Sequence, residues 1–323
     1  MQIMKGIFGL FVSKITELHN SPYYKVLRVR QWLKNGSLFL AILFAGRLFE
    51  PTYFLKVLWG TIIFCGLSSG TYILNDITDI PNDRAHPLKK DRPLAAGKIS
   101  VTTAQIIAVS LTVGSLILAF YTDAGFFVAS AAYILVMLIY NLFLKKIPVI
   151  DVLTVAFGFV LRVLAGSFIS DTPISALLIL TTIFTALFIS FAKRRAEATL
   201  LENQTQKSRA VLKDYPVYLV DKYLTLTFGA AFITYSFFTY QSGFRGTSKL
   251  LTSLLPSTLA RPNWLMITIP VVFYALSRYM FLIYERREGE SPENIILTDK
   301  VLLGTSAVWL TLVIFFLYLL PLI

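Results

Sequence analysis

The polar stretch 75–98 interrupts a largely apolar chain and carries side chains suited to chemistry. Asn75, Asp79 and Asp83 recur every four residues, so a continuing helix would place one amide and two carboxylates on one face, a turn apart. Asp76 points about 100° away from this row. Mg²⁺ prefers oxygen ligands, uses one or two carboxylates and leaves positions for water and substrate phosphate. The row therefore predicts a catalytic Mg²⁺ site formed by Asn75, Asp79 and Asp83.

Basic side chains follow this acidic row directly. Those predicted to bind substrate phosphate are Arg84, His86, Lys89 and Arg92. Acids that hold a metal, next to bases that bind phosphate, are what a diphosphate leaving group requires. The alternative is a solvated polar loop between two membrane helices, which leaves the helical register of the acids unexplained.

The composition places the chain among all-α polytopic membrane proteins. Its 323 residues are 56% hydrophobic and only 15% charged, with a net charge of +12, whereas soluble domains carry about 25% charged residues. The basic excess is spread over loops between apolar runs, which argues for anionic lipid headgroups and anionic substrates and against nucleic acid. The single cysteine, Cys65, lies in an apolar run, so an intrachain disulfide is excluded and a reactive role is not expected.

Nine apolar runs approach the ~20 residues that a helix needs to cross the hydrocarbon. The predicted spans are about 33–48, 53–76, 102–121, 125–144, 149–169, 176–195, 217–240, 263–284 and 299–321. The strands of a membrane barrel would alternate over ~10 residues, and these runs do not. Residues 1–22 predict an interfacial amphipathic helix, with a frayed tail as the alternative, and 23–323 a single transmembrane catalytic domain.

The basic loops predict the orientation in the cell membrane. They follow the second, fourth, sixth and eighth spans, so the positive-inside rule places them and the N-terminus in the cytoplasm. An odd number of spans then places the C-terminus outside. The acidic row faces the cytoplasm in this arrangement, as does the central cavity expected of such a bundle.

Polar residues at the ends of other spans are predicted to converge on the same side. They are Tyr140, Lys145, Lys193, Arg194 and Glu197. Arg162 lies inside an apolar run, nearly on the helical face of Asp151, and ionisable groups there usually face a protein interior and a function. Its alternative role is a structural pair with a buried acid. For Lys193 and Glu197, spaced i, i+4, the alternative is a surface ion pair.

The row and its neighbours resemble a known family. Asn75-Asp76-x-x-Asp79-x-x-x-Asp83, followed by Arg92-Pro93-Leu94, is similar to the first signature of the UbiA superfamily of intramembrane prenyltransferases. Four further segments resemble its decaprenyl-phosphate phosphoribosyltransferase branch: RQWLKN at 30–35, YNLFLK at 140–145, GFVLRVLAG at 158–166 and KRRAE at 193–197. The resemblance covers nearly the whole chain.

The resemblance implies a reaction and its partners. Phosphoribosyl pyrophosphate would donate a 5-phosphoribosyl group to a polyprenyl phosphate in the membrane, releasing pyrophosphate with Mg²⁺ as cofactor, in cell-wall arabinan precursor synthesis. It adds Lys34 to the substrate-binding residues, together with Tyr140, Lys145, Arg162, Lys193, Arg194 and Glu197. Whether the protein is a homo-oligomer is left open, as is the length of the polyprenyl chain.

One departure from the family pattern bears on the reaction. Superfamily members that bind an isoprenyl diphosphate carry a second Asp-rich motif after the sixth span, whereas the loop here offers no close Asp pair. This difference counts against a prenyltransferase that moves an isoprenyl chain from its diphosphate to an aromatic acceptor. A membrane transporter and a scaffold protein are two further interpretations of a chain with nine apolar runs and intramembrane charge.

Overall fold

The computed structural model describes residues 21–86, 89–202, 216–242, 263–286, 295 and 298–320, with side chains omitted over 199–202. The predicted amphipathic helix 1–22 lies almost wholly outside the described residues. The helices are α2 Pro22–Val26, η1 Val29–Phe39, α3 Leu40–Phe44, α4 Pro51–Ala85, α5 Val101–Thr122, α6 Ala124–Leu142, η2 Leu144–Lys146, α7 Ile150–Ser170, α8 Ala176–Glu202, α10 Val217–Gln241, η4 Trp264–Thr268, α12 Ile269–Arg286, α14 Lys300–Ile314 and η5 Phe315–Leu319. Every regular element in the described part of the chain is thus helical, as predicted.

Seven of the described helices are long and apolar enough to cross a membrane, so the predicted count of nine is not confirmed. The segment predicted as the first span is instead a 3₁₀ helix of 11 residues, η1, followed by the 5-residue α3. Its length of roughly 30 Å still approaches the thickness of the hydrocarbon, because a 3₁₀ helix rises ~2.0 Å per residue. The predicted span at 217–240 forms the 25-residue α10, which is not among the seven.

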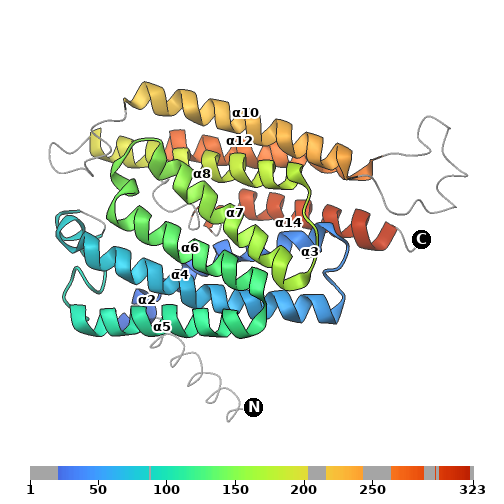
Figure 1. The fold of residues 1–323 in the computed structure, drawn as a ribbon. Coiled ribbons are helices and arrows are strands. Elements are labelled where there is room, and N and C mark those ends of the chain that lie inside the picture. The colour runs from blue at the N-terminus through green and yellow to red at the C-terminus, as the bar shows by residue number, and fades with distance from the viewer. Residues whose placement is uncertain are drawn as a thin grey trace, which may run out of the picture.

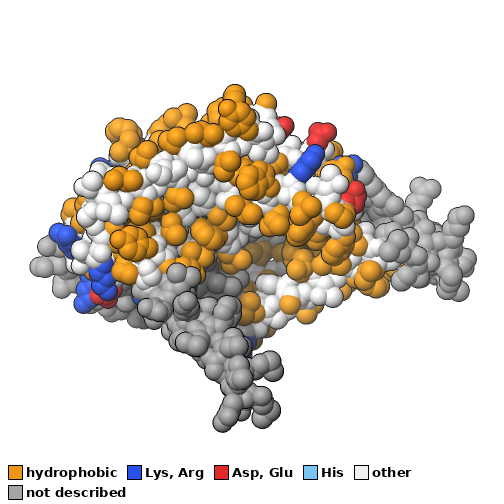
Figure 2. Space-filling model, turned by 90° about the horizontal axis from the view of Figure 1, so that it is seen from below, with side chains coloured by type: hydrophobic (Ala, Val, Ile, Leu, Met, Phe, Trp, Pro, Cys, Tyr) orange, Lys and Arg blue, Asp and Glu red, His pale blue; other side chains and the backbone are white. Residues whose placement is uncertain are grey.

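The long helices lie side by side in two groups that share α7 (Figure 1). One core joins η1, α4, α6 and α7 around the fully buried Phe64, Phe126 and Tyr133. The other joins α7, α8, α10 and α12 around Phe188. Figure 2 shows apolar side chains over the middle of one face, while the charged ones gather toward the two ends. This distribution is that of a multi-pass membrane protein, because hydrocarbon excludes unpaired charges.

The helix α4 carries the acidic row beyond its apolar part. It runs unbroken from Pro51 to Ala85, and the chain becomes extended at His86. The prediction that the helix continues through Asn75, Asp79 and Asp83 is therefore confirmed. At the other end of the chain, Asp299 caps α14 and pairs with Arg278 at 2.8 Å.

Gly166 allows α7 to approach η1 more closely than any other residue would. A Cβ built there would lie 2.0 Å from the carbonyl oxygen of Leu38, which belongs to the backbone and cannot rotate away as a side chain would. Small residues permit such close packing of membrane helices.

We expect Gly166→Ala to destabilise the protein by at least about 2 kcal/mol, since overpacking against a backbone forces the two segments apart. The matched control is Gly114→Ala on α5, where the added Cβ would have no heavy atom within 4 Å. There the better helix propensity of alanine should leave stability unchanged or raise it. Thermal unfolding in detergent measures both variants, and equal midpoints would refute the close approach.

Candidate active site

Two residues of the acidic row converge on one cation. The ammonium group of Lys145, in η2, donates hydrogen bonds to Asp79 Oδ1 at 2.7 Å and to Asn75 Oδ1 at 3.2 Å. It also donates to Thr78 Oγ1 at 3.1 Å. Asp79 is buried, so this ion pair is shielded from water on the α4 side. The helix α6 and its short continuation η2 thus bring a sequence-predicted base onto two sequence-predicted acids.

The third residue of the row has a different partner. Asp83 Oδ2 accepts a hydrogen bond at 2.7 Å from Arg92, whose same nitrogen donates to Asp76 Oδ1 at 3.2 Å. Asp76 also forms an ion pair with Arg28, the residue before η1. Burial would lower the pKa of Arg28, but the carboxylates of Asp76 and Asp83 raise it above its ordinary value, so the guanidinium stays charged.

Helical geometry explains why the row divides. Each residue advances about 100° around the helix, so Asp83 is rotated by about 80° from Asn75 but by only about 20° from Asp76. Asp76, which lies off the row defined by the four-residue spacing, therefore shares Arg92 with Asp83. The spacing of seven residues between Asp76 and Asp83 was the signal that could have found this pair, together with the basic residues of the segment 28–34.

The described acids do not by themselves form a metal cage. Among the residues that the structure describes, no three His, Cys, Asp or Glu side chains cluster as metal ligands. Asn75 and Asp79 nevertheless direct their oxygens at a single cation, the ammonium group of Lys145. The two oxygens are therefore close enough together to share one cation. An amide and a carboxylate that share one cation fit Mg²⁺, which usually takes its remaining ligands from water and substrate phosphate.

A second charged cluster lies between α7 and α8. Arg194 donates to Asp151 Oδ2 at 2.7 Å and to Glu197 Oε2 at 2.5 Å, and all three side chains are buried. Glu197 Oε1 lies 3.8 Å from the ammonium of Lys89, in the loop that follows α4. Glu197 is therefore not part of a surface ion pair. Arg194 is held between two carboxylates, and Lys89 links the loop behind the acidic row to α8.

Arg162 has partners on three elements, and none of them is an acid. It donates to Asn35 Oδ1 at 2.9 Å, to the hydroxyl of Tyr133 at 2.8 Å and to the carbonyl of Gly158 at 3.0 Å. Within the described residues, the alternative of a structural pair with a buried acid is not found: the partners of Arg162 are neutral, and Asp151, on the same helix, is paired with Arg194. These contacts give Arg162 the geometry of a residue that joins η1, α6 and α7.

The remaining predicted residues occupy the same end of the bundle. Lys34 donates to Gln31 at 2.5 Å and lies 5.9 Å from the ring centre of Tyr72, one turn before Asp76. Arg84 donates to the carbonyl of Ala95 at 3.0 Å, which ties the basic loop to α4. Three others are half-buried: Tyr140 in the last turn of α6, His86 directly after α4, and Lys193 beside Arg194 on α8.

Similarity to known proteins agrees with this architecture. A family model described as the UbiA prenyltransferase family matches residues 36–296. The decaprenyl-phosphate phosphoribosyltransferase of Mycolicibacterium smegmatis is 32% identical over 294 residues, which cover 90% of each chain. The protein of the same name in Corynebacterium glutamicum is 32% identical over 92% of this chain and 87% of its own.

A solved structure shares the fold. The UbiA homologue of Archaeoglobus fulgidus, determined bound to DMAPP and Mg²⁺, superposes with a TM-score of 0.64 at 21% sequence identity. The superposition covers 92% of this chain and 99% of that one. The family match extends over most of the described helices, including those that carry the acidic row and the Arg194 cluster. The chain therefore belongs to the UbiA prenyltransferase family.

Proposed function

We propose that the protein is a glycosyltransferase that moves a 5-phosphoribosyl group from phosphoribosyl pyrophosphate to a polyprenyl phosphate. The observation that carries this proposal is the similarity to two decaprenyl-phosphate phosphoribosyltransferases along about nine-tenths of each chain. The acidic row and its interleaved bases support it, since they suit a substrate rich in phosphate. The product would be a lipid-linked phosphoribose for cell-wall arabinan synthesis.

The reaction balances without an added acid or base. The bond between the anomeric carbon and the pyrophosphate oxygen breaks, and pyrophosphate leaves with the electron pair. A phosphate oxygen of the polyprenyl phosphate forms the new bond to that carbon. The attacking oxygen is already anionic, so catalysis rests on positioning and on electrostatic stabilisation of the leaving group and of the positive charge on the ribose.

The position of each basic residue indicates whether it would bind the donor or the acceptor. We assign Arg92, Lys89 and Lys145 to the phosphates of the donor, because they lie against the acidic row or in the loop behind it. Lys34 and Lys193 are candidates for the acceptor phosphate. Arg194, clamped by Asp151 and Glu197, would position Lys89 rather than bind phosphate itself.

Mg²⁺ fits the oxygens of Asn75 and Asp79, with Asp83 one turn further along α4. Bound there, it would act as a Lewis acid for the departing pyrophosphate. The solved relative from Archaeoglobus fulgidus holds Mg²⁺, which agrees with this assignment. Asp83 and Asp76 would keep Arg92 oriented toward the same phosphates.

The proposed location is the cell membrane, with the acidic row facing the cytoplasm. The N-terminus would then lie inside and the C-terminus outside, as the positive-inside rule predicts. Residues 23–323 would form one catalytic domain whose central cavity opens to the cytoplasm. This orientation gives the site access to a phosphorylated sugar, while the tail of the acceptor stays in the bilayer.

A second candidate is a prenyltransferase that uses an isoprenyl diphosphate. The observation that favours it is the fold of the Archaeoglobus fulgidus homologue, whose structure contains DMAPP. That relative shares 21% identity, against 32% for the phosphoribosyltransferases. The phosphoribosyl transfer is therefore the better supported function.

A purified-protein assay tests the proposal. Protein in detergent with Mg²⁺, labelled phosphoribosyl pyrophosphate and a polyprenyl phosphate should give label in the organic phase that depends on both substrates. EDTA should stop the transfer and excess Mg²⁺ restore it, since the carboxylates of the row repel pyrophosphate unless a metal ion lies between them. Folded protein that yields no labelled lipid, yet transfers an isoprenyl chain to an aromatic acceptor, would establish the second candidate instead.

A further inference from the structure

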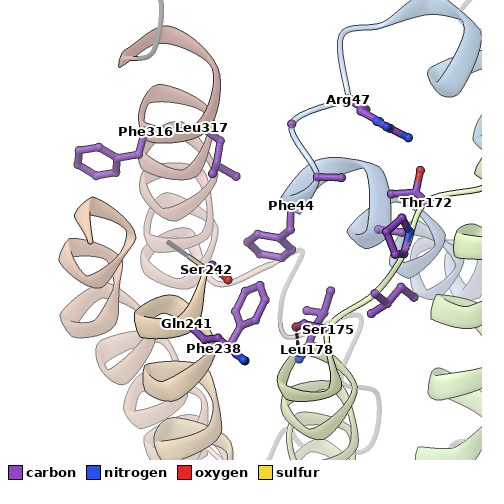
Figure 3. Close-up of a pocket in the computed structure, with 15 residues that line it drawn as sticks. Phe44, Arg47, Thr172, Ser175, Leu178, Phe238, Gln241, Ser242, Phe316 and Leu317 are labelled. Carbon is purple, nitrogen blue, oxygen red and sulfur yellow. Dashed lines mark hydrogen bonds between the residues drawn. The ribbon is translucent and has the colours of Figure 1, made fainter. Parts of the chain in front are cut away.

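A cavity lies at the end of the bundle opposite the acidic row. It has a volume of about 560 Å³ and is formed by α3, the α7–α8 connection, the last turn of α10 and the π-helical turn η5 (Figure 3). Pro51, four residues after the lining residue Arg47, and Asn75 are about 36 Å apart along α4. This separation exceeds the ~30 Å thickness of the hydrocarbon, so the cavity and the candidate active site serve opposite membrane surfaces.

The lining of this cavity combines an apolar floor with a polar rim. Phe44 and Phe238 meet edge to face, with ring centres 4.7 Å apart, and Figure 3 shows them facing each other. The apolar lining continues with Leu178, Phe316 and Leu317, whereas the polar lining is formed by Thr172, Ser175, Gln241 and Ser242. This combination of an apolar body and a few polar groups is typical of small-molecule sites.

One lining residue carries a charge that no ion pair within the described part of the chain neutralises. Arg47 makes no ion pair with any residue in the described part of the chain; its guanidinium lies 4.6 Å from the ring centre of Tyr53. None of the described residues that line the cavity is acidic. The cavity therefore complements a ligand with a negative charge and an apolar body.

The cavity is held open by bonds between distant parts of the chain. The hydroxyl of Tyr318, on η5, donates to the carbonyl of Leu43 at 2.7 Å and accepts from the amide of Leu48 at 3.1 Å. These bonds fix η5 against the turn that carries Arg47. Leu180 and Leu319, on two of the helical elements that line the cavity, are 40% and 49% exposed.

We propose that this cavity binds an anionic phospholipid from the membrane leaflet opposite the active site. Arg47 binds the phosphate, for which a guanidinium is well suited. The acyl chains lie against Phe44, Phe238 and the π-helical turn, and leave past the exposed leucines into the bilayer. The proposal does not rest on the proposed transferase activity, because none of these residues contacts the acidic row.

Native mass spectrometry of the detergent-solubilised full chain, titrated with phosphatidylglycerol, tests this site. Arg47→Gln should weaken binding of the tightest lipid at least tenfold. Lys56→Gln is the matched control, since it removes an exposed charge from the same end of α4 outside the cavity. Ser242→Phe should also abolish tight binding by filling the cavity, and phosphatidylcholine should bind more weakly than phosphatidylglycerol.

Three outcomes would overturn the proposal. An equal loss of phosphatidylglycerol binding in Arg47→Gln and Lys56→Gln would mean that surface charges attract the headgroups diffusely, without a specific site. Unchanged binding in folded Ser242→Phe would place the lipid elsewhere. Competition by soluble glycerol 3-phosphate at the lipid's own affinity would show a site for a free anion instead of a lipid. Phosphoribosyl transfer should persist in Arg47→Gln, so failure of this site and failure of the proposed function are distinguishable.

Discussion

Asp79→Asn should lower kcat for phosphoribosyl transfer at least about a hundredfold while the protein remains folded. Asp79 is the one carboxylate of the row that shares a cation with Asn75, so its charge is central to the proposed Mg²⁺ site. Asparagine retains an oxygen that can accept the hydrogen bond from Lys145, which keeps the local packing. Turnover of the purified variant, with thermal unfolding as the folding measurement, checks the prediction.

The matched control is Asp91→Asn, which removes an exposed carboxylate from the loop behind the row. Its turnover should stay within about twofold of the parent, because a solvated charge contributes little. A second readout separates binding from chemistry. The stabilisation of the folded protein by Mg²⁺ together with pyrophosphate should disappear in Asp79→Asn and persist in Asp91→Asn. Retention of full turnover in Asp79→Asn would remove this carboxylate from the mechanism.

Arg194→Met should destabilise the protein by about 3–5 kcal/mol, because it leaves two buried carboxylates without their common partner. Asp151 and Glu197 each lie within 2.7 Å of the guanidinium, and Asp151 is completely buried. Denaturant unfolding in detergent measures the loss. Phosphoribosyl transfer should fall as well, because a loosened cluster would no longer hold Glu197 beside Lys89.

The neighbouring arginine provides the control for this second prediction. Arg195 pairs with Asp221 at 2.7 Å, but that carboxylate is 35% exposed, so Arg195→Met should cost less than about 1 kcal/mol. A fully stable Arg194→Met protein without turnover would contradict the structural role of Arg194 between Asp151 and Glu197. It would return Arg194 to the role suggested by the sequence, that of a direct phosphate ligand.

The helical architecture could be predicted from the sequence, because insertion into a membrane constrains the composition of each span. The apolar runs predicted an all-helical bundle, and seven of the helices described here meet the requirements for a membrane span. The spacing of Asn75, Asp79 and Asp83 predicted a helix that continues into the polar stretch, and α4 does so to Ala85. Both predictions depend on local periodicity, which needs no knowledge of partners. The family was also recognisable, because its motifs are contiguous segments.

The tertiary structure alone decided which charges meet. Asp76 and Asp83 share Arg92, and Arg194 pairs with Asp151 across 43 residues, because helix packing brings distant segments together. Helix packing likewise places Asn35 and Tyr133 beside Arg162, which donates hydrogen bonds to both. The first predicted span became the 3₁₀ helix η1 with α3, against which α7 packs at Gly166. Hydrophobic periodicity specifies that a segment is buried and helical, but the partner of a buried charge is determined by the neighbouring helix that packs against it.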